Sequence, residues 1–212
     1  MIADKMKNLV NNSSVIRAMF EEGKLMAKER GADNVYDFSL GNPSVEPPKM
    51  VKEAIIEELE KSDATYLHGY MSNSGYEDVR EKIAENINKK YDTKLSSKNL
   101  VMTVGAASGL NIVLKSILNP NDEVIVFSPY FSEYNNYIQN YDGVVVKVSP
   151  NTETFEPNLE EFENKINNKT KAVIINTPNN PTGVIYSEEL IIKLTEIMRR
   201  KEQEYNTQIY LI

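Results

Sequence analysis

The chain has 212 residues, of which 41% are hydrophobic, so it can build one large α/β domain, or one and a half ordinary domains, around a real core. Its net charge of -7, from 31 acidic and 24 basic residues, argues against nucleic acid or an anionic membrane as the main partner and favours a small molecule. It has no cysteine and one histidine, His68, which excludes disulfide scaffolds, soft-metal sites and Ser-His or Cys-His nucleophiles. The N-terminus lacks the apolar core of a signal peptide and no stretch reaches the length of a membrane span, so we expect a cytoplasmic protein.

The first part of the chain differs in pattern from the rest. A helical stretch, "SVIRAMFEEGKLMAKERG", is followed by the extended "VYDFSLGNPSVEPP". This segment is too short to bury a core of its own. We therefore expect an N-terminal arm with a small-domain segment over residues 1–45 and the main domain over residues 46–212.

The main domain begins with two amphipathic helices and then alternates between strands and helices. Apolar residues recur at helical spacing in "PPKMVKEAIIEELEKS" and "SGYEDVREKIAENINKKY". Short runs rich in Val and Ile then predict strands that are buried on both faces. Helical stretches separate most of them, which predicts a doubly wound, mostly parallel sheet. The predicted strands are residues 99–104, 122–127, 143–148, 171–176 and 208–212.

Ligands of open α/β sheets bind at the carboxyl ends of the strands, so the residues after each strand are informative. After the first strand, "VGAASG" places Gly105, Ala106 and Ala107 at the start of a helix. Bare N–H groups at a helix N-terminus make a seat for a phosphate. The alternative is a tight strand-to-helix turn with small packing residues.

Two other strand ends carry candidate binding groups. "SPYFSEY" places Phe131 where an aromatic ring can stack on a flat cofactor, although a core aromatic is the alternative. "NTPNNPTG", residues 176–183, has more asparagine and proline than a turn requires, and the amide of Asn180 can donate to a ligand oxygen. The alternative is that the loop is only a turn. A phosphate seat, a stacking ring and an amide donor together predict a site for a phosphorylated aromatic cofactor.

Five motifs in this order and spacing give the chain a family resemblance: "LGNPSVEPP", "HGYMSNSGYEDVR", "TVGAASGL", "DEVIVFSPYFSEY" and "NTPNNPTG". The chain resembles, from about Asp37 onward, the N-terminal part of a class I/II aminotransferase of the aspartate aminotransferase fold (fold type I). These enzymes use pyridoxal 5'-phosphate (PLP) to move an amino group between an amino acid and a 2-keto acid. The resemblance implies a three-layer αβα sandwich with a mostly parallel sheet, here incomplete and preceded by an N-terminal arm.

The resemblance also implies roles for single residues. Asn180 would hydrogen-bond the ring hydroxyl oxygen of the cofactor, and Phe131, often Trp or Tyr in relatives, would stack on the ring. The backbone at Gly105, Ala106 and Ala107 would hold the phosphate. In this family the bond before the proline that matches Pro181 is commonly cis.

Two further residues match family positions outside the main domain's strand ends. Tyr70 matches the tyrosine that reaches the phosphate of the neighbouring subunit, which implies a homodimer. Gly41 matches the glycine whose backbone meets the substrate carboxylate. His68, by contrast, is interpreted as a surface residue.

The residues needed for catalysis itself are missing. Transamination needs a lysine that holds the cofactor and moves a proton, and the family's lysine follows the strand that here is residues 208–212. Lys115, Lys171 and Lys193 fall on helix faces or at a strand start, so no residue is assigned as catalytic and none as a metal ligand. We therefore expect the N-terminal fragment of a longer enzyme. The resemblance places two absent strands between the first strand and the fourth, so that the first strand lacks its usual neighbours.

Three functions remain open from the sequence. The favoured one is the N-terminal fragment of a PLP-dependent aminotransferase. A second is a fragment of another enzyme of the same fold, such as a carbon-sulfur lyase, because the residues present serve the cofactor rather than the reaction type. A third is a truncated, non-catalytic module that binds a partner or the cofactor.

Overall fold

The computed structural model of the chain describes residues 2–11, 15–38, 41 and 45–212. It divides into two compact units, Met1–Val79 and Arg80–Ile212, and each is described by itself. These units are defined by compactness alone and do not test where a domain begins. The predicted domain boundary near residue 45 therefore stays a prediction.

The first unit is helical and contains little buried surface. Its helices are α1 (Asp4–Asn11), α2 (Val15–Arg30), η1 (Ala32–Asn34), α3 (Lys49–Lys61) and α4 (Ala64–His68). Helix α3 begins directly after Pro48, as its sequence predicts, and α4 is capped by Asp63, whose carboxylate accepts from the N–H groups of Thr65 and Tyr66. Among the described residues of this unit only Gly75 is buried. The unit therefore builds no hydrophobic core from these residues.

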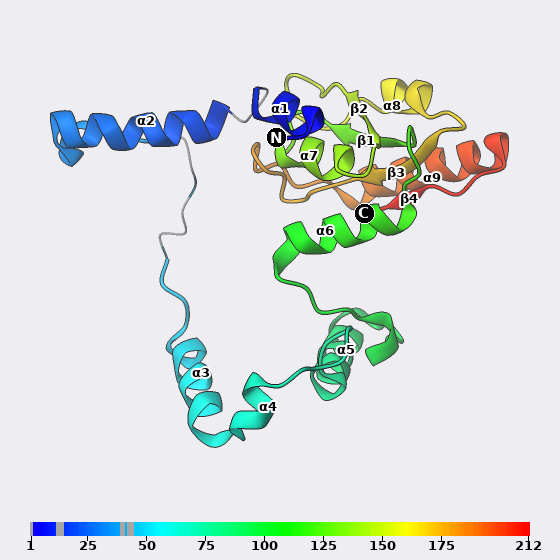
Figure 1. Ribbon diagram of the computed structural model, residues 1–212. Helices are drawn as coiled ribbons and strands as arrows, with labels where there is room; N and C mark the ends of the chain where they lie inside the picture. The colour runs from blue at the N-terminus through cyan, green and yellow to red at the C-terminus, as the bar shows by residue number, and fades with distance from the viewer. Residues whose placement is uncertain (1, 12–14, 39–40, 42–44) are drawn as a thin grey trace. The chain divides into compact units, whose positions relative to one another are not determined.

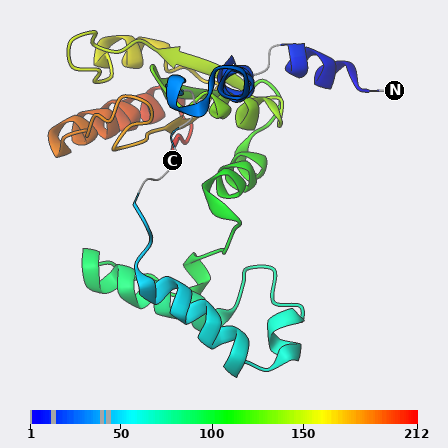
Figure 2. The same cartoon turned by 90° about the vertical axis from the view of Figure 1, so that its left-hand side faces the viewer.

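The second unit is an α/β sandwich and can be followed from green to red in Figures 1 and 2. Its strands form one parallel sheet in the order β2-β1-β3-β4. The elements, beginning with a helix that starts just before the unit boundary, are α5 (Glu77–Tyr91), η2 (Ser97–Asn99), α6 (Gly105–Ile117), β1 (Glu123–Phe127), α7 (Glu133–Gln139), β2 (Val144–Val148), α8 (Leu159–Lys165), β3 (Thr170–Ile174), α9 (Glu188–Tyr205) and β4 (Tyr210–Leu211).

Helices cover both faces of this sheet, because alternate strand residues point to opposite sides. On one face Ile125, Val148 and Val173 pack against α8 and α9, with Phe162 fully buried between the layers. On the other face Val124, Val126, Ala172 and Ile174 pack against α6 and α7. The unit is thus the three-layer αβα sandwich that the sequence predicts.

The predicted first strand is an exception. Residues 100–104 form no strand, and Val101 and Val104 are 60% and 93% exposed. A strand needs a neighbour to satisfy its backbone groups, and this segment pairs with none of the described strands. In the sheet β1 and β4 lie on either side of β3, the predicted fourth strand, and the position of the two strands that the resemblance places between the first strand and the fourth stays a prediction.

Candidate functional site

The strand order creates a switch point between β1 and β3. The chain leaves β1 toward β2 through α7 on one face, and it leaves β3 toward β4 through α9 on the other face. The two connections therefore diverge, and ligands of open α/β sheets bind beyond the carboxyl ends of the strands at such a point. Residues 128–132 follow β1 and residues 175–187 follow β3, and these loops contain Phe131 and Asn180.

Helix α6 brings its first turn to the same edge of the sheet. It ends at Ile117, shortly before β1 begins at Glu123, and its Leu110, Leu114 and Ile117 pack on the face that carries Val124 and Val126. The helix therefore runs antiparallel to β1, as Figure 1 shows, and its start lies at the carboxyl end of the sheet. Phe131 packs against the same hydrophobic cluster as Leu110.

The first turn of α6 is open to an anion. No side chain caps it, and it has no acidic residue. Gly105, Ala106 and Ala107 are exposed, and a Cβ atom on Gly105 would meet nothing within 4 Å. Gly105 has a φ of +81°, a left-handed conformation that glycine adopts without steric cost. Unpaired N–H groups at the positive end of a helix fit the size and charge of a phosphate.

Aromatic rings line the loop after β1. Phe131 is half-buried and meets the ring of Tyr134 edge-on, with 5.7 Å between the ring centroids. The hydroxyl of Tyr130 donates to Asn135 at 2.8 Å, so this ring is also held. Burial raises the pKa of the Tyr134 hydroxyl above its ordinary value, which already leaves a tyrosine neutral at physiological pH. A flat ligand would therefore meet fixed, uncharged rings here.

The loop after β3 uses its asparagines in two ways. The side-chain oxygen of Asn179 accepts from the hydroxyl of Thr182 at 2.9 Å, and Asn179 is buried. The side-chain oxygen of Asn176 accepts from the backbone N–H of Asn180 at 2.8 Å. The Asn180 side chain is exposed and makes no hydrogen bond among the described residues. Two of the three asparagines thus build the loop and one faces outward, a distinction that the sequence did not show.

The peptide bond between Asn180 and Pro181 is cis, as the family resemblance implies. Thr177–Pro178 and Ser128–Pro129 are cis as well, and neither was expected.

Five of the seven predicted site residues therefore lie at one edge of the second unit: Gly105, Ala106, Ala107, Phe131 and Asn180. The other two, Gly41 and Tyr70, belong to the first unit. Gly41 is exposed, and the motif "LGNPSVEPP" around it lies partly outside the described residues. Tyr70 is fully exposed. In sequence it lies between Tyr66 and Tyr76, whose rings stack on each other with 4.6 Å between their centroids. Their predicted roles stay predictions.

A set of polar residues before α6 was missed by sequence reasoning. The guanidinium of Arg80 donates to the carbonyl oxygen of Ser97, and the carboxylate of Glu81 accepts from the Ser97 N–H at 2.8 Å. Asn88 bonds both backbone groups of Leu95. These contacts fix α5 to the segment that leads into α6. They join residues that are distant in sequence, so no local pattern indicates them.

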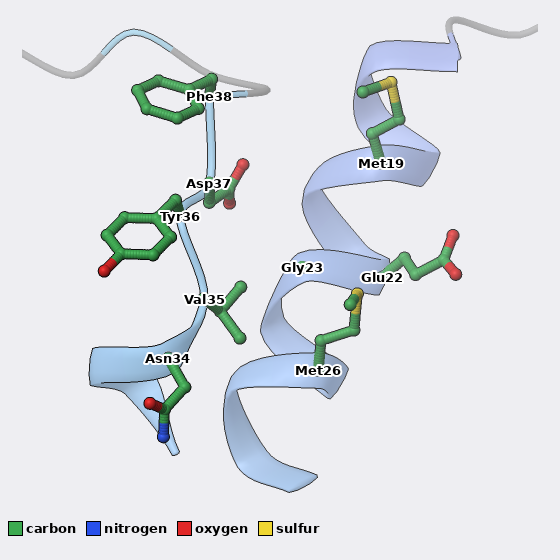
Figure 3. A pocket seen from close by; sticks show the side chains of 9 residues that line it. All are labelled: Met19, Glu22, Gly23, Met26, Asn34, Val35, Tyr36, Asp37 and Phe38. Atoms are coloured by element: carbon green, nitrogen blue, oxygen red, sulfur yellow. The ribbon is translucent and has the colours of Figure 1, made fainter. Parts of the chain in front are cut away.

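A separate hollow of about 500 Å³ lies in the first unit (Figure 3). Met19, Gly23 and Met26 of α2 form one side, and Val35 and Phe38 lie on the other. None of the predicted site residues lines it, so it is no part of the candidate site.

Within the residues that the structure describes, no cluster of acidic or histidine side chains could hold a metal ion. None of the described helices has the length and apolar character that a membrane span requires.

Comparisons with known proteins place this architecture. A family model described as "Aminotransferase class I and II" matches residues 33–203. The aspartate aminotransferase of Thermotoga maritima is 31% identical over 208 residues, which cover 95% of this chain and 54% of that protein. The probable aspartate/prephenate aminotransferase of Aquifex aeolicus is 35% identical over 170 residues, or 80% of this chain and 42% of that protein.

Solved structures that resemble this chain are also aminotransferases. The crystal structure of an aminotransferase from Eubacterium rectale matches all of this chain and 54% of its own, with a TM-score of 0.93 and 38% identity. That of the Thermotoga maritima aspartate aminotransferase matches 99% of this chain and 53% of its own, with a TM-score of 0.84. The chain thus spans about half the length of the relatives it matches. The match of the family model over most of the chain, together with these relatives, shows that the chain belongs to the aminotransferase class I and II family.

Proposed function

We propose that this chain is the N-terminal half of a PLP-dependent aminotransferase, which moves an amino group between an amino acid and a 2-keto acid. The observation that carries the proposal is the switch point between β1 and β3, because an uncapped helix start, a held aromatic ring and an exposed amide lie at that edge of the sheet. Relatives of about twice this length support the view that other residues complete the enzyme.

The residues at this edge fit the cofactor. The exposed N–H groups of Gly105, Ala106 and Ala107 would bind its phosphate, and the ring of Phe131 would cover one face of its pyridine ring. The amide of Asn180 would donate to the ring hydroxyl oxygen. When bound, PLP supplies an electron-withdrawing ring that stabilises negative charge at the substrate's α-carbon.

The remaining roles lie outside this unit or outside the chain. The backbone of Gly41 would meet the substrate carboxylate. Tyr70 would reach the phosphate of a neighbouring subunit in a homodimer. The lysine that holds the cofactor would belong to the second half of the enzyme, and we expect the whole protein to work in the cytoplasm, without nucleic acid or membrane partners.

A titration of the chain with pyridoxine 5'-phosphate tests the proposed site. This molecule keeps the ring, the ring hydroxyl and the phosphate, but its alcohol cannot react with surface lysines. We expect NMR signals of the amides at 105–107 and of the Asn180 side chain to shift with one common, weak dissociation constant. Pyridoxine, which lacks the phosphate, is the control and should bind more weakly. Shifts that avoid both loops would contradict the proposal.

Borohydride reduction after incubation with PLP tests whether this chain lacks the catalytic lysine. We expect scattered, substoichiometric labelling of surface lysines and no amino-group transfer. Each lost charged hydrogen bond is worth roughly 1.5 to 3 kcal/mol, so losing two would weaken binding about a hundredfold or more. One lysine labelled stoichiometrically, with measurable turnover, would show that the chain carries a complete site.

A further inference from the structure

The loop after β3 is held by a framework of hydrogen bonds. The backbone N–H of Asn179 donates to the carbonyl oxygen of Val184 at 2.9 Å, and that of Gly183 donates to the carbonyl oxygen of Asn179 at 2.7 Å. The hydroxyl of Thr177 accepts from the N–H of Tyr186 at 2.9 Å. Tyr186 is buried in the core beneath α9, so this framework is anchored to the sandwich.

One bond of this framework reaches Asn180 directly. Asn176 lies at the carboxyl end of β3, next to Ile175, whose N–H donates to the carbonyl oxygen of Ile212 at 2.9 Å. Asn176 is half-buried, and its side-chain oxygen accepts from the N–H of Asn180 at 2.8 Å. The peptide group of Asn180 is therefore tied to the end of a paired strand.

We propose that Asn176 is a positioning residue, which fixes the peptide group of Asn180 and so the direction in which the Asn180 amide leaves the loop. The proposal rests on the function proposed above for Asn180. Asn180 is exposed and its side chain has no other described partner to orient it. An amide donor held in one orientation binds its acceptor more tightly than one that must be ordered at binding.

The chain offers variants that separate this role from a general effect on the fold. Asn176→Ala removes the acceptor, whereas Asn176→Asp keeps an oxygen in the same place and should preserve the bond. Thr177→Val is the matched control, because it breaks a different bond of the same loop, the one to Tyr186. Asn180→Ala removes the proposed donor itself.

Two measurements on the whole chain test the proposal. One is the hydrogen-exchange rate of the backbone N–H of Asn180 by NMR, and the other is the affinity for pyridoxine 5'-phosphate. We expect Asn176→Ala to speed the exchange about five- to tenfold and to weaken affinity by a similar factor, as for the loss of one hydrogen bond. Asn176→Asp should restore both. Thr177→Val should leave the exchange of Asn180 unchanged.

The double variant Asn176→Ala/Asn180→Ala completes the test. If Asn176 acts through Asn180, its loss adds no further weakening once Asn180 is gone. An equal further loss in the double variant would overturn the inference, and so would faster exchange without loss of affinity or no change in either quantity. Asn180→Ala with undiminished affinity would instead overturn the proposed role of Asn180, which makes the two failures distinguishable.

Discussion

The backbone N–H of Ser97 donates to the carboxylate of Glu81 at 2.8 Å, across 16 positions of sequence. The neighbouring guanidinium of Arg80 donates to the carbonyl oxygen of the same Ser97. Both backbone groups of one residue are thus held by two adjacent side chains of α5. Ser97 lies just before the segment that leads to α6, so this pair of contacts fixes the approach to the predicted phosphate seat.

This contact predicts a loss of stability in acid. The hydrogen bond from the Ser97 backbone, with a smaller contribution from the Ser97 side chain, lowers the pKa of Glu81. A carboxyl group whose pKa is lower in the folded than in the unfolded state stabilises the fold above its unfolded pKa, and this contribution is lost as the pH falls through the folded value. Urea unfolding at about pH 7 and at about pH 3 should show a smaller pH difference for Glu81→Gln than for the unsubstituted chain. Identical pH differences would contradict the assignment.

The buried face of α6 predicts a strong dependence of the sandwich on one leucine. Leu114 is 0% exposed and packs against residues of the sheet. Leu114→Ala should therefore lower the free energy of unfolding by about 2 to 5 kcal/mol. Ile112 on the same helix is 48% exposed, and Ile112→Ala should cost less than about 1 kcal/mol. Urea unfolding measures both, and equal losses would mean that α6 does not pack as the structure shows.

Two glycines of α6 should respond to alanine with opposite signs. Gly105 has a φ of +81°, so Gly105→Ala should destabilise the chain by about 1 to 2 kcal/mol, although its Cβ would have free space. Gly109 lies within the helix, where its Cβ would meet only Thr103 Oγ1 at 3.4 Å. Gly109→Ala should therefore stabilise the chain by about 0.5 to 1 kcal/mol. Thermal or urea unfolding distinguishes the two, and a shared sign would refute the backbone argument.

The exposure of Tyr70 predicts an effect that appears only in the complete enzyme. Its hydroxyl makes no hydrogen bond among the described residues, so Tyr70→Phe should leave the unfolding of this chain unchanged. In the full-length protein the same change should weaken PLP retention about tenfold or more, because a charged hydrogen bond to phosphate is lost. Tyr66→Phe is the control, since Tyr66 stacks on Tyr76. Unchanged PLP affinity would remove the proposed role of Tyr70 across the dimer.

Much of the sandwich could be predicted from the sequence because its signals are local. Strands buried on both faces must be apolar throughout, so β1, β2 and β3 stand out as runs of Val and Ile and were located within about two residues. Residues 99–104 show the limit of this signal. The run "NLVMTV" has the composition of a strand, but composition does not supply the neighbouring strand that its backbone needs.

The sequence by itself also indicated which residue types could hold a phosphorylated ring, because Gly105, Phe131 and Asn180 each follow or precede an element in a recognisable local pattern. Only the tertiary structure decided which of them lie at the same edge of the sheet. The order β2-β1-β3-β4 makes the loops after β1 and β3 neighbours. The hydrogen bonds of the folded loop distinguish Asn176 and Asn179, which build it, from Asn180, whose side chain faces outward. Likewise the hydrogen bonds of Arg80 and Glu81 to the backbone of Ser97 join residues that are 17 and 16 positions apart in sequence. Hydrogen bonds between distant residues are set by packing and strand order, and neither leaves a periodic mark in the chain.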